Sequence, residues 1–584
     1  MRQKKAILSG NEAIARGVWE AGVRLASGYP GTPSTEILEN VKNYKDIYSE
    51  WAPNEKVALE VGIGSSIAGA RTLVAMKHVG INVAADPLFT FSYTGVKGGL
   101  ILVSADDPAM HSSQNEQDNR NYGRFAKIPV IEPSDSQECK DFVATALDLS
   151  EQFDTPVMYR TTTRTSHSKS MVTLGERQKQ SGKIELEKNM PKYTMLPVSA
   201  KRRHPLVEER IVKLKEYAET TPLNRIEYHD TKIGVITNGI SYQYVREALP
   251  EASVLKLGLT YPLPGNKIKE FAAKVEQLII VEEGDPFFEE QVKAMGVAVA
   301  HGKDLFPFTG EFSVAFIRNQ IGGIAIELKD AVADLPGRPP AFCPGCSHRG
   351  IFTILKKLKV FVSGDIGCYT LGALPPISAM HSCICMGASI SMGHGIAKVV
   401  EQSDDLSQKV VSVIGDSTFF HSGMTSLLNS IYNKSNSVAM ILDNRTTGMT
   451  GGQENPGSGR TLDGEEAISA DIPALVKAFG IKNVVKIDPY NLVDIEEKMK
   501  AALASDEMVV VVVEAPCVLR YRISHPPLKV DREKCTGCKQ CLKVSCNALS
   551  LEGQGDDSFV VIDPNMCAGC GICAQVCKFD AIGA

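Results

Sequence analysis

Residues 410–444 read VVSVIGDSTFFHSGMTSLLNSIYNKSNSVAMILDN, and this stretch decides the fold class of the region around it. Val410 to Ile414 and Val438 to Leu442 are nearly continuous apolar runs, as expected of parallel strands that are buried on both faces. The intervening residues from Thr425 to Tyr432 have helical spacing. A right-handed crossover places two such strands side by side or nearly so. The sequence therefore predicts an open, parallel α/β sheet.

Two oxygen-bearing side chains directly follow these strands. Asp416 and Asn444 come just beyond the carboxyl ends, which is the edge where open parallel sheets bind ligands. Hard oxygen donors suit magnesium, which takes few protein ligands and completes its octahedron with phosphate oxygens and water. The pattern therefore predicts Mg²⁺ and a diphosphate at this edge. A Gly-Asp pair followed by an Asn is common by itself, and an Asx turn that caps a helix is the alternative.

This pattern resembles the thiamine-diphosphate motif, which usually reads Gly-Asp-Gly and is followed by an Asn. Here the motif stands as Gly415, Asp416 and Ser417 with Asn444, so serine replaces the second glycine. The resemblance also implies that the backbone carbonyl of Thr446 is a third metal contact.

Thiamine-diphosphate enzymes need a second, related domain that binds the pyrimidine ring. Residues 54–78, NEKVALEVGIGSSIAGARTLVAMKH, resemble the pyrimidine-side helix of that domain. The resemblance implies that Glu60 hydrogen-bonds the aminopyrimidine and favours the imino tautomer that forms the ylide. Glu55 is the competing candidate. Either carboxylate could instead lie on a solvated helix face.

Upstream, residues 28–37 read GYPGTPSTEI and resemble the Tyr-Pro-x-Thr-Pro-Ser loop of 2-oxoacid oxidoreductases. The resemblance makes Thr32 the candidate contact for the substrate carboxylate. A proline-bounded turn before a helix N-cap is the structural alternative. Both interpretations can hold, because loops beside a rigid sheet often carry functional residues.

Cysteines are concentrated at the C-terminus, where eight of the fifteen lie in the last fifty residues. CTGCKQCLKVSC begins at Cys535 and CAGCGICAQVC begins at Cys567, so the runs are offset by 567 − 535 = 32 residues, and VDREKC and IDPNMC introduce them. Disulfides are improbable in a large chain without a secretion signal. Thiolates three residues apart can converge on one cubane cluster, whereas a structural zinc site rarely uses eight cysteines in this way.

The duplicated runs resemble a bacterial two-cluster ferredoxin, in which the last Cys of each run crosses to the other cluster. The first run has four residues before its last Cys instead of three, and Asn547 and Lys578 replace the usual prolines. The resemblance assigns one [4Fe-4S] cluster to Cys535, Cys538, Cys541 and Cys577, and the other to Cys546, Cys567, Cys570 and Cys573.

The phrase LPGRPPAFCPGCSHRG at 335–350 is the most family-specific text in the chain. It resembles the start of the diphosphate domain in indolepyruvate ferredoxin oxidoreductase alpha subunits. The resemblance implies a third cluster near the thiamine, which would ease electron transfer to the ferredoxin-like module. Its ligands would be Cys343, Cys346, Cys368 and Cys517. Buried cysteines also serve as small apolar residues, and the same region contains Cys383 and Cys385.

At 584 residues the chain is too long for one core, since single cores stop growing near about 250–300 residues. The resemblance implies an α/β, multidomain fold with two thiamine-diphosphate-binding-type parallel-sheet domains, a transketolase C-terminal-like α/β domain and a two-cluster ferredoxin-like α+β module. The expected segments are 1–174 (pyrimidine domain), 175–231 (charged connector), 232–330 (transketolase C-terminal-like domain), 331–526 (diphosphate and Mg²⁺ domain) and 527–584 (ferredoxin-like module).

Composition narrows the function further. A hydrophobic share of 43% and a charged share of 22% are those of an ordinary globular protein. A net charge of -5 disfavours nucleic acid binding. The sequence shows neither a signal peptide nor a membrane span, so we expect a cytoplasmic location.

Taken together, the resemblance implies oxidative decarboxylation of aryl 2-oxoacids such as indole-3-pyruvate, with coenzyme A as co-substrate and ferredoxin as electron acceptor. It also implies a smaller beta subunit of the gamma type and the pairing of two alpha chains in a heterotetramer. The alternatives are an oxidoreductase for pyruvate or 2-oxoglutarate, a non-oxidative decarboxylase, and an electron-transfer subunit with a decayed thiamine site.

Overall fold

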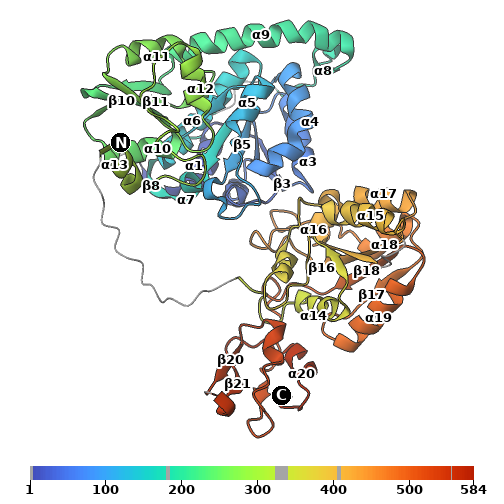
Figure 1. The fold of residues 1–584 in the computed structure, drawn as a ribbon. Coiled ribbons are helices and arrows are strands. Elements are labelled where there is room, and N and C mark those ends of the chain that lie inside the picture. The colour runs from blue at the N-terminus through green and yellow to red at the C-terminus, as the bar shows by residue number, and fades with distance from the viewer. Residues whose placement is uncertain (1–3, 179–183, 323–339, 404–408, 554, 584) are drawn as a thin grey trace. The chain divides into compact units, whose positions relative to one another are not determined.

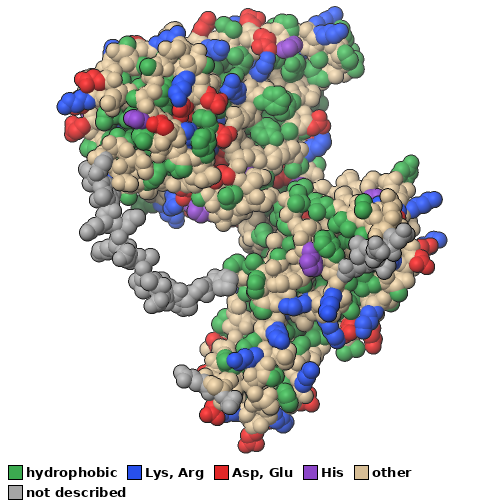
Figure 2. All heavy atoms as spheres, in the orientation of Figure 1, with side chains coloured by type: hydrophobic (Ala, Val, Ile, Leu, Met, Phe, Trp, Pro, Cys, Tyr) green, Lys and Arg blue, Asp and Glu red, His purple; other side chains and the backbone are tan. Residues whose placement is uncertain are grey.

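The computed structural model describes residues 4–178, 184–322, 340–403, 409–553 and 555–583, which fall into two compact units, Met1–Ala331 and Val332–Ala584 (Figure 1). Positive and negative side chains are interspersed over the visible surface of each unit (Figure 2). Among the described residues, no helix combines the length and the apolar character that a membrane crossing requires.

A seven-stranded sheet forms the centre of the first unit. All neighbouring strands are parallel except for the edge strand β12, which is antiparallel to β6. In sheet order the strands are β12 (Leu259–Tyr261), β6 (Val130–Ile131), β7 (Val157–Thr162), β5 (Leu100–Asp106), β4 (Thr72–Lys77), β2 (Leu25–Gly28) and β3 (Tyr48–Trp51).

Helices cover both faces of this sheet. The apolar side chains of α3 and α4 form one buried cluster with β4 and β5, while α1 packs against α6. A two-stranded antiparallel sheet, β1 (Lys5–Ser9) with β8 (Lys169–Thr173), lies beside them. The helices are α1 (Gly10–Glu20), α2 (Thr35–Val41), α3 (Glu55–Ile67), α4 (His78–Thr94), α5 (Arg120–Ala126), α6 (Ser136–Phe153) and α7 (Thr163–His167).

The described part of the predicted connector contains two helices, α8 (Met190–Tyr193) and the long α9 (Pro197–Thr220). After α9 the chain forms β9 (Asn224–Glu227), which pairs antiparallel with β11 in the next sheet. That sheet has the order β13-β10-β11-β9. Its other elements are β10 (Asp230–Asn238), α10 (Gly239–Ala248), β11 (Ala252–Leu257), α11 (Gly265–Ala272), β13 (Gln277–Val281), α12 (Phe287–Ala294) and α13 (Val314–Gly322).

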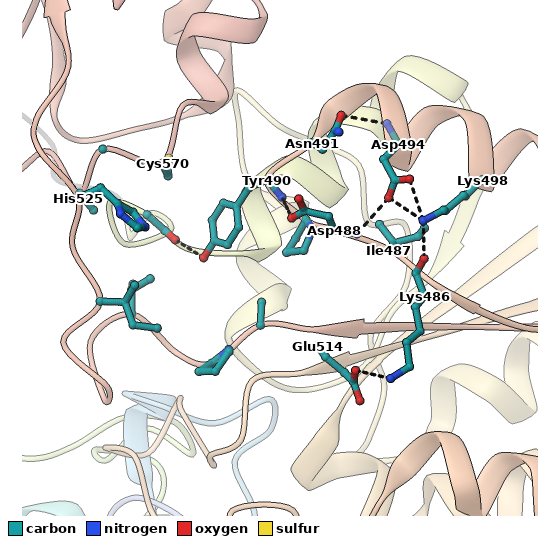
Figure 3. A pocket seen from close by; sticks show the side chains of 18 residues that line it. Lys486, Ile487, Asp488, Tyr490, Asn491, Asp494, Lys498, Glu514, His525 and Cys570 are labelled. Atoms are coloured by element: carbon teal, nitrogen blue, oxygen red, sulfur yellow. Dashed lines mark hydrogen bonds and ion pairs between the residues drawn. The ribbon is translucent and has the colours of Figure 1, made fainter. Parts of the chain in front are cut away.

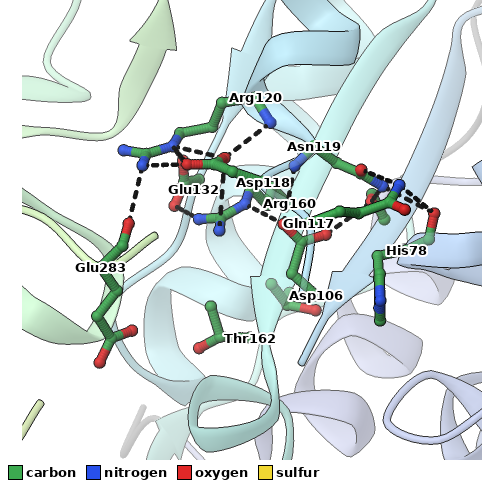
Figure 4. Close-up of polar contacts among 12 residues, drawn as sticks. His78, Asp106, Gln117, Asp118, Asn119, Arg120, Glu132, Arg160, Thr162 and Glu283 are labelled. Atoms are coloured by element: carbon green, nitrogen blue, oxygen red, sulfur yellow. Dashed lines mark hydrogen bonds and ion pairs between the residues drawn. The ribbon is translucent and has the colours of Figure 1, made fainter. Parts of the chain in front are cut away.

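A buried ionic network joins the two sheets of the first unit (Figure 4). Arg120 is fully buried and pairs with Asp118 and with Glu282, which follows β13. Arg160 on β7 pairs with Asp106 at 2.6 Å and with Glu132 at 2.8 Å. Because buried charges are tolerated only when they are paired, this network ties the sheets together at a defined geometry.

The second unit contains the sheet that the opening stretch of sequence predicts. All five strands are parallel, in the order β14 (Phe361–Ser363), β15 (Val410–Gly415), β16 (Val438–Asp443), β18 (Val509–Glu514) and β17 (Val484–Lys486). The two predicted strands are therefore neighbours, as the crossover rule requires.

Helices also flank both faces of the second sheet (Figure 1). One buried cluster joins α14 and α19 to β15 and β18, and another joins α15, α17 and α18 to the opposite face. The helices are α14 (His348–Leu358), α15 (Ala388–Val400), α16 (Asp416–Thr418), α17 (Met424–Tyr432), α18 (Ile472–Ala478) and α19 (Leu492–Ala504).

The ferredoxin-like module packs against this domain. Its Val544, Val560 and Ile572 belong to the same buried cluster as Val411 and Val511 of the sheet. The module thus shares a core with its neighbour. Its elements are β19 (Lys529–Val530) paired with β22 (Ile582–Gly583), β20 (Leu549–Glu552) paired with β21 (Phe559–Ile562), and the short helix α20 (Ile572–Gln575).

Candidate active site

The predicted magnesium ligands meet at the carboxyl edge of the second sheet. Asp416 follows β15 and Asn444 follows β16, and these strands pair in parallel up to Gly415 and Leu442. The backbone amide of Thr446 donates to Asp416 Oδ2 and to Asn444 Oδ1, both at 3.1 Å. One turn after β16 therefore holds all three predicted ligands together.

The surroundings of Asp416 fit a bound cation. The carboxylate is buried, and Asn455 Nδ2 donates to its Oδ2 at 3.0 Å. Burial and the nearby Asp443 carboxylate raise the pKa of Asp416 to about 7. This arrangement suits Mg²⁺, which binds one or two protein carboxylates together with phosphate oxygens.

Serine is accommodated at the position where the thiamine motif usually has its second glycine. The Oγ of Ser417 lies 2.9 Å from the Oγ1 of Thr447, within hydrogen-bonding distance, and the side chain is buried. Gly415 is more constrained, because a Cβ there would lie 2.8 Å from the ring of Tyr369. The departure from the usual motif therefore leaves the turn intact.

Four cysteines surround a cavity of about 450 Å³ beside this turn. They come from three separate regions of the chain, and Asn444 lines the same cavity. Burial, together with the neighbouring Cys517 and Cys343 thiols, raises the pKa of Cys368 to about 11. The structure thus brings together the four residues predicted as a cluster site, namely Cys343, Cys346, Cys368 and Cys517.

Two residues that are close in sequence to the cavity cysteines were missed by the sequence interpretation. Asp365 follows β14, and its carboxylate accepts the amides of Gly387 and Ser389, both at 2.9 Å, at the start of α15. The imidazole of His348 lines the cavity, and burial lowers its pKa to about 4. A polar residue directly after a strand was the only sequence signal for Asp365, and His348 had none beyond the CPGCSHRG phrase.

The ferredoxin-like module gathers its cysteines into two groups. One small cavity is lined by Cys535, Cys538, Cys541 and Cys577. In the other group, burial and the neighbouring thiols raise the pKa of Cys573 to about 12, and Cys570, Cys546 and Cys567 contribute more to this rise than Cys541 of the first group does. Each group contains three residues of one run and the last Cys of the other, which is the crossed arrangement expected of a two-cluster ferredoxin.

The first unit contains three predicted site residues. Thr32 and Glu55 lie near the carboxyl edge of the seven-stranded sheet, and Glu60 lies further along α3, the helix that begins with Glu55. Thr32 follows β2, and its carbonyl accepts from Ser112 Oγ at 3.4 Å. Glu55 begins α3 and is 5% exposed. Glu60 lies roughly 7.5 Å further along the helix axis, with a side chain that is 46% exposed and ion-paired with Lys56.

Lys77, a buried lysine beside Thr32, was also missed by the sequence interpretation. Lys77 ends β4, and its Nζ donates to the carbonyl of Ser112 at 2.7 Å. Burial lowers the pKa of Lys77 to about 8, although the Asp107 carboxylate opposes the shift. Nothing in the local pattern AMKH signalled a functional lysine.

Comparison with known protein families agrees with this geometry. Residues 16–232 match the thiamine-diphosphate-binding domain of pyruvate flavodoxin/ferredoxin oxidoreductases, and residues 365–513 match the C-terminal thiamine-pyrophosphate-binding domain of thiamine enzymes. Residues 560–583 match the 4Fe-4S binding domain. Fold and site together define a 2-oxoacid:ferredoxin oxidoreductase that uses thiamine diphosphate and iron-sulfur clusters.

Whole-length relatives specify the family. The chain is 40% identical to the indolepyruvate oxidoreductase subunit IorA of Archaeoglobus fulgidus, over 99% of this chain and 97% of that protein. It is 41% identical to the IorA subunit of Pyrococcus horikoshii, over 99% and 96%. The chain belongs to the IorA family of indolepyruvate oxidoreductase subunits.

More distant similarities cover parts of the chain. The 2-oxoglutarate synthase subunit KorA of Methanothermobacter thermautotrophicus is 25% identical over 50% of this chain and 91% of its own length. The solved structure of 2-oxoglutarate:ferredoxin oxidoreductase from Magnetococcus marinus aligns with a TM-score of 0.45 at 16% identity, over 55% of this chain and 65% of that one.

Proposed function

We propose that this chain oxidatively decarboxylates aryl 2-oxoacids, with indole-3-pyruvate as the substrate and coenzyme A as the acyl acceptor. The products are the aryl-acetyl-CoA and carbon dioxide, and the two electrons pass singly through iron-sulfur clusters to ferredoxin. The observation that carries this proposal is that Asn444, a predicted ligand of the magnesium diphosphate, lines the same cavity as four cysteines.

Thiamine diphosphate and Mg²⁺ would be held at the turn beside β15 and β16. Asp416, Asn444 and the carbonyl of Thr446 are the proposed metal ligands, while Gly415 and Ser417 shape the turn around the diphosphate. When bound, thiamine diphosphate would supply the nucleophilic and electron-accepting chemistry that decarboxylation of a 2-oxoacid requires. Asn455 holds the Asp416 carboxylate in place from the side.

Three [4Fe-4S] clusters are proposed, two in the ferredoxin-like module and one in the cavity beside Asn444. The cavity of about 450 Å³ and its four cysteines support the third cluster. Cluster ligands must be thiolates, and a bound cluster stabilises them in spite of the burial that raises their pKa values. Because Asn444 lines the same cavity, the third cluster would be the one closest to the bound thiamine diphosphate and the first to receive electrons.

We propose Glu55, in place of the initially preferred Glu60, as the carboxyl group that hydrogen-bonds the aminopyrimidine. Glu55 is buried at the ligand-binding edge of its sheet, whereas Glu60 is exposed and pairs with Lys56 on its own helix. Thr32 lies at the same edge as Glu55 and remains the proposed contact for the substrate carboxylate. Lys77, which reaches the loop at Ser112, would add positive charge there.

The functional assembly is proposed to contain more than this chain. Its relatives are named as subunits, which supports a smaller beta subunit of the gamma type. Two copies of each chain would form a heterotetramer that donates electrons to ferredoxin. We place this complex in the cytoplasm and expect no nucleic acid or membrane partner.

The test is an assay of the complex, prepared anaerobically with its smaller subunit. Indole-3-pyruvate should reduce a viologen dye only when coenzyme A is present, and should do so faster than pyruvate or 2-oxoglutarate. A preference for 2-oxoglutarate, the 2-oxoacid in the name of the KorA relatives, would favour the alternative oxidoreductase. Aldehyde as the sole product would indicate a non-oxidative decarboxylase, and failure to bind thiamine diphosphate would leave only an electron-transfer subunit.

A further inference from the structure

Arg349 occupies an unusual position between two of the proposed cluster sites. It lies in the first turn of α14, directly after the CPGCSH phrase, and its side chain is 0% exposed. Its Nη2 donates to the carbonyls of Phe342 at 2.6 Å and Cys343 at 2.9 Å. These hydrogen bonds therefore hold the guanidinium against the loop that carries Cys343 and Cys346, two of the cysteines in the cavity.

The other terminal nitrogen of the same guanidinium faces the ferredoxin-like module. Nη1 donates to the carbonyl of Val544 at 2.6 Å and also to that of Ser545, the residue before Cys546. The planar fork of arginine thus bridges two loops that are almost 200 residues apart in the sequence, and each loop carries a proposed cluster ligand.

The charge of Arg349 lacks a counter-ion among the described side chains. Its hydrogen bonds go to backbone carbonyls, and no described carboxylate pairs with it. Its Nε is also buried without a hydrogen-bond partner. A buried, unpaired cation strongly opposes folding, and carbonyl dipoles offset only part of the lost hydration. An anion that binds close by would complete the site.

Bound clusters would supply that anion. A cubane held by four thiolates has a net negative charge, which grows by one on reduction. The Arg349 guanidinium donates to the carbonyl of Cys343, a proposed ligand in the cavity beside Asn444, and to the carbonyl of Ser545, which precedes Cys546 of the module. Arg349 is therefore close to both proposed cluster sites.

We propose that Arg349 is a shared counter-cation for two [4Fe-4S] clusters, the one held by Cys343 and its partners and the one that includes Cys546 and Cys570. This inference rests on the third cluster of the proposed function. Arg349 is a positioning residue: it fixes the distance between the two cluster loops, and its charge stabilises the reduced form of both clusters.

Uncharged contacts tie the same two regions together and provide a matched control. Tyr490 Oη donates to the carbonyl of Gly345 at 2.9 Å, and Gln575 Nε2, on the helix that carries Cys573, donates to the carbonyl of Tyr490 at 2.7 Å. Figure 3 shows Tyr490 with Cys570 in a second cavity of the same unit, which Gly345 also lines. Tyr490→Phe removes a hydrogen bond to the cysteine loop without changing any charge.

The test is a redox titration of the anaerobic complex, followed by electron paramagnetic resonance. In Arg349→Gln, both neighbouring clusters should become harder to reduce. At a fixed solution potential their reduced-to-oxidised ratios should fall by about tenfold, the size expected for a unit charge roughly 10 Å away at an effective dielectric constant of about 20. Tenfold equals a shift of about 59 mV for a one-electron couple. The cluster that includes Cys535 should shift less and serves as an internal reference.

Two further variants separate charge from structure. Arg349→Lys keeps the charge but cannot reach four carbonyls, so its thermal midpoint should fall while both potentials stay near those of the wild type. Tyr490→Phe should leave the potentials unchanged. If Arg349→Gln does not fold, the Arg349→Lys potentials decide the question, and a shift as large as tenfold in that variant would overturn the proposal.

The iron content distinguishes the possible failures. Three clusters correspond to twelve irons per chain, and wild-type protein with only eight would refute the third cluster of the proposed function. With twelve irons present, unchanged potentials in Arg349→Gln would refute the role of Arg349 alone. Equal shifts of all three clusters would also refute it, because they would indicate general loosening and not a local charge.

Discussion

Replacing Glu55 by glutamine should abolish most of the catalytic activity while leaving the fold intact. The carboxyl group lies at the start of α3, at the ligand-binding edge of the sheet, and is 5% exposed. It is also closely packed, because a Cβ added at Gly80 would come within 2.6 Å of the Glu55 Cγ. Glutamine has the same shape but cannot exchange a proton with the aminopyrimidine.

The expected magnitude separates Glu55 from Glu60. Loss of a positioned acid-base group lowers rates by about 10²–10⁴-fold, so kcat of Glu55→Gln should fall within that range. The Glu60 side chain is 46% exposed, and its pairing with Lys56 has the i,i+4 spacing. Such pairs contribute about 0.3–0.5 kcal/mol, so Glu60→Gln should change stability slightly and kcat less than about twofold.

The assay is coenzyme-A-dependent dye reduction at saturating thiamine diphosphate, with cofactor binding measured separately by calorimetry. Glu55→Gln should still bind the cofactor, and Gly80→Ala, which crowds the same carboxyl group, should also lose activity. A Glu55→Gln variant with wild-type kcat, together with an inactive Glu60→Gln variant that binds cofactor, would reverse the assignment.

Three other outcomes follow from the described geometry. Asp416→Ala should lose the stabilisation that Mg²⁺ and thiamine diphosphate give the wild type, about 2.7 kcal/mol at a hundredfold excess over Kd, and an unchanged thermal shift would contradict the metal site. Cys346→Ser should lower the iron content by one cluster while the module keeps both of its own, whereas loss of all iron would mean that the cavity supports folding and not a separate cluster. Burial alone would raise the pKa of Asp118, but the Arg120 and Arg160 guanidinium groups hold it at about 2, below the usual range of an aspartate. Because the folded-state pKa is lowered, this stabilisation is present above about pH 4 and is lost as the pH falls toward 2, by up to about 2 kcal/mol; Asp118→Asn should be less stable at pH 7 and lack this part of the acid dependence in denaturant titrations.

The sequence alone predicted the parts of this protein whose signals are local. The apolar runs of β15 and β16 identify a buried parallel sheet, and polar residues directly after them must lie at its ligand-binding edge. The spacing and duplication of the eight C-terminal cysteines likewise indicate iron-sulfur binding, whereas their crossed grouping is what the ferredoxin resemblance implies. The family resemblance carried the remaining assignments, including the four cysteines that meet in the cavity beside Asn444.

Tertiary structure decided what depends on contacts between distant segments. Glu55 and Glu60 are equivalent in a sequence pattern, but only the position of α3 on the sheet buries one and exposes the other. The pairing of β12 with β6 and the shared core of the ferredoxin-like module are likewise long-range. In the sequence, Arg349 is an ordinary arginine at the start of a helix. Only the folded chain places it among the carbonyls of two cysteine loops. Local periodicity encodes which elements form, whereas burial and charge pairing arise only when those elements pack.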